Sequence, residues 1–178
     1  MLADLPDRDL AALASREAFE VLFHRHRNPV YHFIARQVAD RALAEDLFQT
    51  VFLKAFRALA TFRGSAEFRT WLFTIASHAI TDERRRDRSV VALTDAIESP
   101  AASRGPGAES GEVAGLVRRI IDGLPERHRR LFLLVRYHQM RIAEAAAVVG
   151  LTPGSAKVTL FRIQSQIGSQ LKTLGVLL

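Results

Sequence analysis

The residues best suited to acid–base or metal chemistry are the six histidines, but their spacing does not assemble a reactive site. His24 and His26 are two residues apart, so on a helix their rings point in different directions. The sequence contains no H-E-x-x-H pattern, no glycine-rich phosphate loop and no nucleophile elbow. It also lacks cysteine, which excludes a thiolate nucleophile, a thiolate metal site and a disulfide. We therefore expect no enzyme activity, no cofactor and no metal. The other histidines are His32, His78, His128 and His138.

A different chemistry, contact with a polyanion, is indicated by the stretch TPGSAKVTLFRIQ at 152–164. Thr152 is a favourable N-cap, and Pro153 suits the first helical position, where its missing N–H costs nothing. At 100° per residue, one side of this helix is an apolar stripe of Ala156, Leu160, Ile163 and Ile167. The other side carries Gly154, Ser155, Val158, Phe161, Arg162 and Ser165, flanked by Lys157 and Thr159.

The helix that precedes this stretch completes a recognisable pattern. The alanine-rich segment IAEAAAVV at 142–149 is followed by a turn of three residues, GLT, and then by the helix just described. Two helices joined in this way are typical of a helix-turn-helix. The small residues of the first turn would let the helix N-terminus approach a phosphate or a base edge closely. Any helical hairpin can show the same pattern, so it indicates DNA binding without settling it.

The distribution of charge supports a nucleic-acid partner more strongly than the total of +6. Residues 1–56 have a net charge of −1, residues 57–88 of +3, residues 89–112 of −3 and residues 113–178 of +7. The last segment holds ten basic and three acidic side chains. Two basic segments therefore flank an acidic one, an asymmetry typical of proteins that contact nucleic acid.

The chain is long enough for two small domains, and both parts are predicted to be helical. The stretch at 95–112 is rich in Pro, Gly, Ala and Ser and has no apolar period, which indicates a linker. We place domains at 1–90 and 113–178, joined by a flexible linker at 91–112. The fold class is thus all-α, with an N-terminal helical bundle and a C-terminal helix-turn-helix domain.

Local signals predict the helices of the two domains. In the first domain, helices should begin after Ser15, at Pro29 behind an Asn28 cap, and after Asp40, and the last should run from about Phe68 to Arg86. A loop should lie at 62–67. Candidate core residues of that last helix are Trp71, Leu72, Ile75, Ala76 and Ala79. The second domain should contain helices at about 113–122, from Pro125 onward, at 142–149 and from Pro153.

Three stretches in this order resemble the extracytoplasmic-function (group 4) sigma factors of bacterial RNA polymerase. DRALAEDLFQTVFLKAFRAL at 40–59 resembles the family's polymerase-binding helix. FRGSAEFRTWLFTIASHAITDERRR at 62–86 resembles its promoter-melting and −10-reading segment. LPERHRRLFLLVRYHQMRIAEAAAVVGLTPGSAKVTLFRI at 124–163 resembles its −35-reading domain. The resemblance implies two helical domains, no enzyme activity, and a role in directing core polymerase to promoters.

The resemblance also implies contact residues. Core polymerase, through the beta-prime coiled coil, would meet Glu45, Asp46, Gln49, Thr50 and Phe52. The −10 element would meet Phe62, Arg63, Ser65, Glu67, Phe68, Arg69, His78, Arg84, Arg85 and Arg86. In that set, Ser65 and Glu67 would hydrogen-bond a flipped base, and Phe62 and Phe68 would stack on it. His78 stands where the family commonly has asparagine.

The −35 element would meet the outer face of the last helix. The residues implied are Thr152, Gly154, Ser155, Lys157, Val158, Thr159, Phe161 and Arg162. Thr159 and Gln164 stand at positions that the family often fills with arginine. Implied partners are core polymerase (the beta-prime coiled coil and the beta subunit), promoter DNA and an anti-sigma factor, with no small-molecule substrate.

One alternative function class remains beside this interpretation. A stand-alone helix-turn-helix regulator would explain residues 113–178 but not the first domain. Such regulators usually dimerise on two half-sites, whereas we expect this protein to be a monomer when free. The first residues carry three aspartates and no apolar run, and no apolar run is long enough for a membrane span. We therefore expect a cytoplasmic protein.

Overall fold

The computed structural model describes residues 1–93 and 112–173, with side chains for 1–87 and 113–173. The chain divides into two compact units, Met1–Gly105 and Pro106–Leu178. Every regular element in the described ranges is helical, so the predicted all-α class is confirmed. The predicted linker lies mostly outside the described residues, because α4 extends to Leu93 and α5 begins at Glu112.

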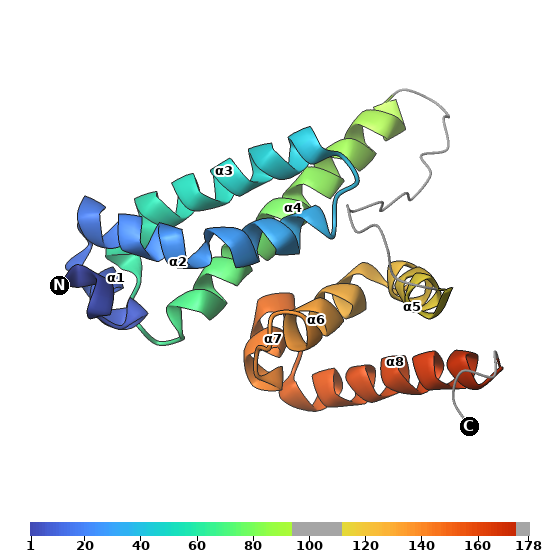
Figure 1. Ribbon diagram of the computed structural model, residues 1–178. Helices are drawn as coiled ribbons and strands as arrows, with labels where there is room; N and C mark the ends of the chain where they lie inside the picture. Colours follow the sequence, from blue (N-terminus) through green and yellow to red (C-terminus); the bar gives the residue numbers. More distant parts are fainter. Residues whose placement is uncertain (94–111, 174–178) are drawn as a thin grey trace. The chain divides into compact units, whose positions relative to one another are not determined.

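The described residues of the first unit, 1–93, form four α-helices and two short 3₁₀ turns (Figure 1). They are η1 (Leu2–Asp4), α1 (Asp7–Leu13), α2 (Arg16–Ala35), α3 (Arg41–Ala58), η2 (Leu59–Thr61) and α4 (Phe68–Leu93). Two predicted caps are confirmed, because Ser15 Oγ accepts from Ala18 N at 3.1 Å and Asp40 Oδ1 accepts from Ala42 N at 2.8 Å. Each satisfies a backbone N–H that would otherwise lack a partner in the first helical turn.

The prediction of a helix boundary at Asn28 and Pro29 is wrong, because Pro29 lies inside the continuous helix α2. A proline at this place removes one backbone hydrogen bond, at a cost of roughly 3 kcal/mol. However, residues on both sides of it share one buried face, including Leu22, Val30 and Phe33. Each fully buried apolar side chain contributes about 1.5–3 kcal/mol, so the continuous face outweighs the lost bond.

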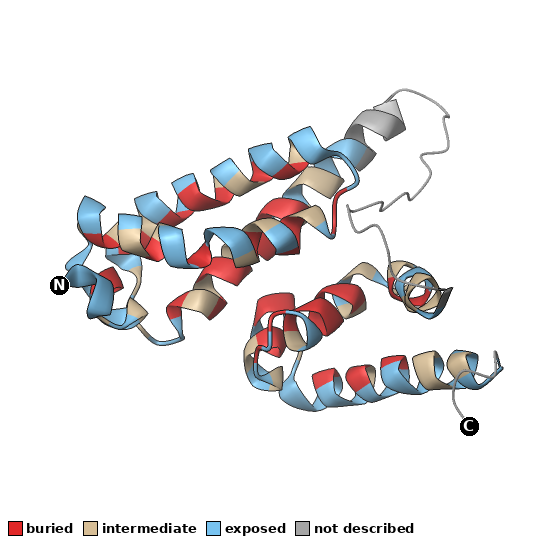
Figure 2. Ribbon diagram, viewed as in Figure 1, coloured by how far each residue is buried: buried red, intermediate tan, exposed pale blue. Residues whose placement is uncertain are grey.

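The core of the first unit forms where α2, α3 and α4 pack together. Figure 2 shows the buried stripe along each helix and the exposed residues on its outer side. Phe33 of α2 meets Phe73 of α4 edge to face, with ring centroids 5.1 Å apart. The predicted core residues Leu72, Ala76 and Ala79 are buried. Trp71 and Ile75, in contrast, are only half-buried.

Helix α4 runs seven residues beyond the predicted end at Arg86. The three arginines at 84–86 therefore lie within the helix and not at its end. Arg84 instead donates to the backbone carbonyl of Gln37 at 2.7 Å, and it is half-buried. This bond ties α4 to the chain segment between α2 and α3.

In the second unit, the described residues 112–173 form four helices. Helix α6 packs on α7 and α8, α7 packs on α8, and α5 packs on α8. Their bounds are α5 (Glu112–Asp122), α6 (Glu126–Arg136), α7 (Ile142–Val149) and α8 (Pro153–Thr173). Helix α7 ends at Gly150, whose φ of +70° is a left-handed conformation that glycine adopts without strain. Leu151 N then donates to Ala146 O at 2.9 Å, which closes the helix end and sets the tight turn into α8.

Candidate functional site

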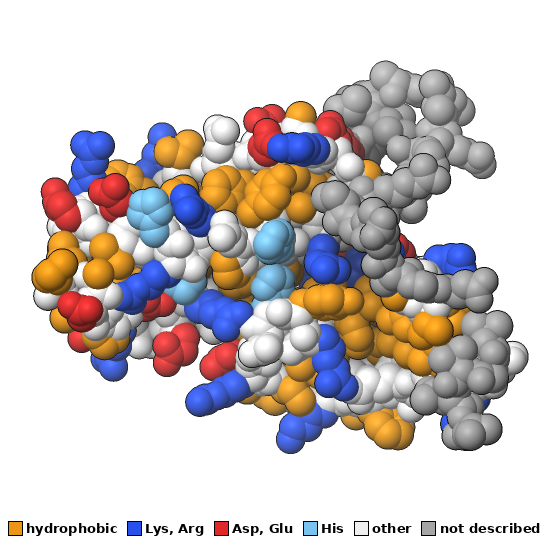
Figure 3. Space-filling model, in the orientation of Figure 1, with side chains coloured by type: hydrophobic (Ala, Val, Ile, Leu, Met, Phe, Trp, Pro, Cys, Tyr) orange, Lys and Arg blue, Asp and Glu red, His pale blue; other side chains and the backbone are white. Residues whose placement is uncertain are grey.

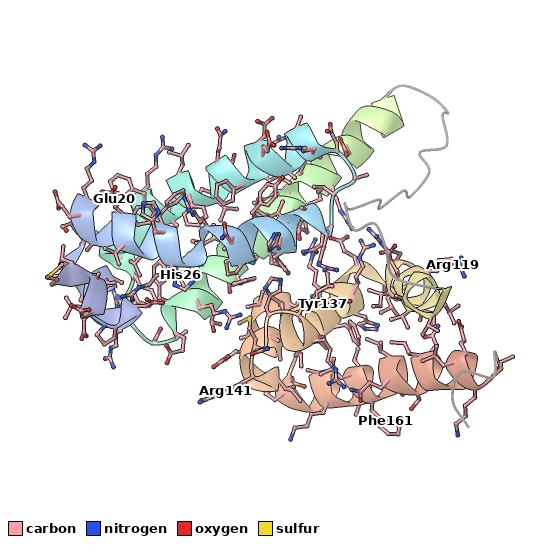
Figure 4. The ribbon with its side chains drawn as sticks, viewed as in Figure 1. Glu20, His26, Arg119, Tyr137, Arg141 and Phe161 are labelled. Carbon is pink, nitrogen blue, oxygen red and sulfur yellow. The ribbon has the colours of Figure 1, made fainter. Side chains whose placement is uncertain are left out.

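The outward face of α8 is the most complete match between sequence prediction and structure. Ala156, Leu160 and Ile163 are buried, whereas Val158 and Phe161 are 52% and 69% exposed. Figure 4 shows the Phe161 side chain pointing away from the other helices of its unit. The exposed residues of this face are Gly154, Ser155, Lys157, Val158, Phe161 and Arg162, with Thr159 half-buried at its edge.

The first turn of α8 is held by its predicted cap. Thr152 Oγ1 accepts from Ser155 N at 3.1 Å and donates to Ser155 Oγ at 2.9 Å. A Cβ added at Gly154 would meet no atom of the chain within 4 Å. Glycine is therefore not required there by packing inside the protein, and the space beside it is open to an external group.

The 62–67 loop connects η2 to α4 and is anchored by aromatic rings. Phe62 is half-buried, with its ring 5.6 Å from that of Phe68 and 5.2 Å from that of Trp71. Gly64 has a φ of +66°, so the loop turns there through a left-handed residue. Arg63, Ser65 and Glu67 are exposed. The loop thus exposes polar side chains, and the packed rings of Phe62, Phe68 and Trp71 form the aromatic base that supports it.

Phe68 does not fit its predicted role. It is 1% exposed and packs between Phe62, Trp71 and His26, so its ring offers no face on which a base could stack. The sequence reasoning was wrong here because an aromatic residue beside a polar loop can equally be its anchor. Phe62 and Trp71, both half-buried, are the rings at this site that retain exposed surface.

Helix α4 continues the same surface away from the loop. Trp71, Thr74, His78 and Arg85 follow one another at helical spacing along one side, and His78 and Arg85 are exposed. His78 lies about 10 Å along the helix axis from Trp71, from 1.5 Å per residue.

The structure separates the other arginines that were predicted to act together. Arg86 pairs with Glu83 at 2.8 Å, Arg84 lies on the inner side, and the Arg69 guanidinium lies 5.7 Å from the Phe73 ring centroid. Only Arg85 lies on the stripe that contains His78.

Helix α3 buries Leu47, Val51 and Ala55 and presents a mixed polar and apolar face on its opposite side. Glu45, Asp46 and Gln49 are exposed there, as predicted, and Thr50 is half-buried. Glu45 is also engaged by Arg41, at 2.9 Å. Phe52, predicted as a contact, is 6% exposed and is instead a core residue that packs against Phe23 with ring centroids 4.8 Å apart.

The structure adds two residues to this face that sequence reasoning missed. Leu53 is 56% exposed and Phe56 is 46% exposed. They follow Gln49 at helical spacing, on the same side as Asp46. A helical wheel alone could have found Leu53, since it lies opposite the buried stripe. Phe56 belongs to an aromatic ladder of Tyr31, Phe48, Phe23, Phe52, Phe19 and Phe56, where hydrophobic side chains gather between α2 and α3 (Figure 3).

A charged cluster joins α1 to α2 near the base of the 62–67 loop. Asp7 Oδ1 accepts from Arg25 Nη1 and Asp7 Oδ2 from His26 Nε2, both at 2.6 Å. The hydrogen bond from His26 holds the pKa of Asp7 below its ordinary value of 3.8; burial opposes this shift, and the bond from Arg25 adds to it. The Asp7 carboxylate is therefore ionised, and its two hydrogen bonds fix the start of α1.

Two features are absent from the described part of the chain. Among the side chains of 1–87 and 113–173, no group of three or more His, Asp or Glu residues is arranged to hold a metal ion. Among the described helices, none is both long and apolar enough to cross a membrane.

Comparison with known proteins identifies the two units. The family model described as Sigma-70 region 2 matches residues 22–90, and the model described as Sigma-70, region 4 matches residues 114–163. The RNA polymerase sigma factor CarQ of Myxococcus xanthus is 34% identical over 151 residues, covering 83% of this chain and 86% of its own. The chain belongs to the extracytoplasmic-function sigma factors of RNA polymerase.

Two further comparisons agree with this assignment. The ECF RNA polymerase sigma-E factor of Escherichia coli (strain K12) is 29% identical over 174 residues, covering 89% of each chain. A solved structure of the sigma factor RpoE in complex with the anti-sigma factor NepR from Bartonella quintana shares the fold, with a TM-score of 0.71 at 21% identity. It covers 86% of this chain and 96% of that one.

The matched regions contain the surfaces described above. The region 2 match spans most of α2, all of α3 and most of α4, and so includes the α3 face and the 62–67 loop of the sigma factor. The region 4 match spans the helix-turn-helix and ends within α8, at the last buried residue of its apolar stripe, Ile163. Helix α1 lies before the first match.

Proposed function

We propose that this sigma factor uses three surfaces of its two units, one to bind core polymerase and two to recognise the promoter. Residues 1–90 act as region 2, residues 113–178 act as region 4, and residues 91–112 connect them. The face of α3 docks on core polymerase, the 62–67 loop and the His78 stripe of α4 read the −10 element, and α8 reads the −35 element. The observation that supports the proposal is that each unit exposes, within the region matched by its family model, most of the contact residues that the sequence resemblance implies.

The −35 assignment is supported by the composition of the exposed face of α8. A capped helix N-terminus with small residues fits the major groove closely. Lys157 and Arg162 would neutralise phosphates, and Val158 and Phe161 would contact base edges. Because apolar side chains pack against the 5-methyl group of thymine, this face should prefer a sequence that contains thymine.

The docking assignment is supported by the mixed character of the α3 face. Asp46 and Gln49 provide hydrogen-bonding groups, and Leu53 and Phe56 provide exposed apolar area. Such a combination of apolar anchors and polar neighbours is typical of protein–protein contacts. The partner we propose is the beta-prime coiled coil of core polymerase, with further contacts to the beta subunit.

The −10 assignment is supported by exposed polar groups placed over aromatic rings. Ser65 and Glu67 are positioned to hydrogen-bond the edge of an unpaired base. Phe62, with its remaining exposed surface, is the ring that would stack, in place of Phe68. Arg63 and Arg85 would approach phosphates near this site, whereas Arg86 is paired with Glu83 and Arg69 lies against the Phe73 ring.

We further propose that the protein acts without catalysing a reaction, in the cytoplasm, and under the control of an anti-sigma factor. The fold it shares with a sigma factor solved in complex with an anti-sigma factor supports the last point. A partner of this kind would compete with core polymerase for the α3 face.

Co-elution of the purified full chain with core RNA polymerase on gel filtration tests the proposal. We expect a stoichiometric complex that survives dilution. A stand-alone helix-turn-helix regulator would elute separately from core polymerase and would bind duplex DNA as a dimer, and that result would contradict the proposal.

A further inference from the structure

Helix α1 lies outside the matched sigma regions, yet it packs against both segments that flank the 62–67 loop. These segments are η2, which precedes the loop, and α4, which follows it. A short helix of seven residues has little stability of its own. Its position therefore depends on specific contacts, and those contacts converge on the loop.

The first contact runs from Asp7 through His26 to the end of the loop. Because an ionised carboxylate only accepts, His26 Nε2 donates to Asp7 Oδ2, at 2.6 Å. The His26 side chain is 8% exposed, and its ring lies 5.4 Å from that of Phe68. Phe68 in turn anchors Phe62 and Trp71, so the carboxylate of Asp7 fixes the ring that supports the aromatic base of the loop.

The second contact is between Arg8 and the turn of the loop. A Cβ at Gly64 would lie 3.1 Å from Arg8 Nε and within 4 Å of Arg8 Cγ and Cδ. The Arg8 side chain therefore lies directly against the one left-handed residue of the loop. Asp7 and Arg8 are adjacent, and one supports the end of the loop while the other supports its middle.

We propose that α1 is the positioning element of the 62–67 loop, with Asp7 acting through His26 and Phe68, and Arg8 acting at Gly64. This rests on the proposed function of the loop in reading a −10 base. A base pocket must be held in one geometry before DNA arrives, since the energy needed to unstack a base leaves little for ordering the pocket. Asp7 and Arg8 are thus positioning residues that set −10 discrimination without touching the base.

Trp71 provides a direct readout of the loop, because it is the single tryptophan of the chain and lies 5.2 Å from Phe62. We would measure acrylamide quenching of its fluorescence in the full-length protein without DNA. Asp7→Ala and Arg8→Ala should each raise the quenching constant by roughly twofold, because a loosened loop opens more often. The matched control is Asp9→Ala, which removes an exposed charge from the same helix and should change nothing.

The second measurement compares holoenzyme binding to −10 single strands that differ in one base. Asp7→Ala should reduce discrimination between these strands by roughly tenfold, as expected for the loss of a hydrogen bond to a charged group. Arg8→Ala should reduce it in the same direction, because the Arg8 side chain no longer lies against Gly64. Binding to a −35 duplex should stay unchanged. Uniform weakening on every DNA would mean that Arg8 is a phosphate contact, and it would overturn the proposal.

If Asp7→Ala fails to fold, Gly64→Ala provides a second variant that tests the same proposal. The added Cβ is strained by the positive φ and crowded by Arg8, so Arg8→Ala should restore part of the discrimination that Gly64→Ala loses. Strictly additive effects, or unchanged quenching in all three variants, would overturn the proposal. If Ser65→Ala leaves −10 preference unchanged, the base-reading role fails, whereas Trp71 quenching still decides whether α1 positions the loop.

Discussion

Helices α3 and α8 each bury one stripe and expose two large apolar side chains three residues apart. In α3 these are Leu53 and Phe56, 56% and 46% exposed; in α8 they are Val158 and Phe161, 52% and 69% exposed. Exposed apolar pairs of this kind, rimmed by polar residues, mark contact surfaces. The two helices therefore have the same apolar geometry, and their difference lies in the charges around it.

Those charges indicate different classes of partner. Helix α8 has no acidic residue between Pro153 and Thr173, and it carries Lys157 and Arg162 beside its apolar pair. The exposed face of α3 carries Glu45 and Asp46 about two turns before Leu53. Phosphates repel such carboxylates, so α3 suits a protein and α8 suits DNA. The apolar spacing identifies a contact face, and the charge identifies what it contacts.

The largest expected effect tests the α3 half of this comparison, the docking of α3 on a protein. The double substitution Asp46→Ala and Gln49→Ala should weaken binding of core polymerase by about 100-fold or more, as for interface hot spots. Both side chains are exposed, so thermal unfolding should be nearly unchanged. Fluorescence titration of labelled protein with core polymerase measures the affinity. Glu20→Ala, an exposed carboxylate on α2, is the control, and equal affinity of the double variant would remove the docking assignment.

The next largest effect concerns α8, where substitutions can separate the contribution of charge to DNA binding from that of apolar contact. Lys157→Ala and Arg162→Ala should each lower the salt dependence of −35 binding by about one phosphate contact, for any sequence. Phe161→Ala should weaken binding about tenfold, leave the salt dependence unchanged and abolish the preference for thymine over uracil at the contacted position. A salt titration on matched thymine and uracil duplexes distinguishes the two roles. A Phe161 variant with normal thymine preference would contradict direct contact.

A smaller effect concerns base reading by the 62–67 loop and by α4. Ser65→Ala and His78→Asn should change the preferred −10 sequence by a few fold per base while leaving total DNA affinity nearly constant, because base contacts specify and phosphate contacts position. Selection of open complexes from a randomised −10 library would reveal the change. Identical consensus sequences from wild type and both variants would show that these side chains do not face the base.

The smallest expected effect concerns Asp7, which lies outside both α3 and α8. Its pKa is lowered in the folded protein, so its stabilisation is present above about pH 3.8 and is lost as pH falls through the lower folded value. Asp7→Asn should reduce the free energy of unfolding by about 1 kcal/mol at neutral pH, and the difference from wild type should vanish in acid. Urea unfolding across this pH range provides the measurement. A difference that persists in acid would show that the ion pair is not its source.

Local signals in the sequence were sufficient for three helix starts but not for every helix boundary or side chain. The caps at Ser15, Asp40 and Thr152 were predictable, because each is an interaction between residues two or three apart. The outward face of α8 was predictable from periodicity alone. Pro29 was not, because whether a helix tolerates a proline depends on burial by helices distant in the sequence.

The site residues that failed did so for the same reason. Phe52 and Phe68 lie next to exposed contact residues, yet each points into the core. Arg84 is one of three adjacent arginines, and only the fold places the Gln37 carbonyl within its reach. Neighbouring residues on a helix point about 100° apart, so a motif gives the location of a site without specifying which of its members face the partner.

The most direct test of the account is transcription in a reconstituted reaction with purified core polymerase, the full-length protein and fragmented genomic DNA. We predict initiation at a limited set of start sites that share −35 and −10 elements. This initiation should be lost when either the α3 face (Asp46→Ala with Gln49→Ala) or the α8 face (Phe161→Ala with Lys157→Ala) is changed. Start sites no different from those of core polymerase alone, or unaffected by the α3 change, would contradict it.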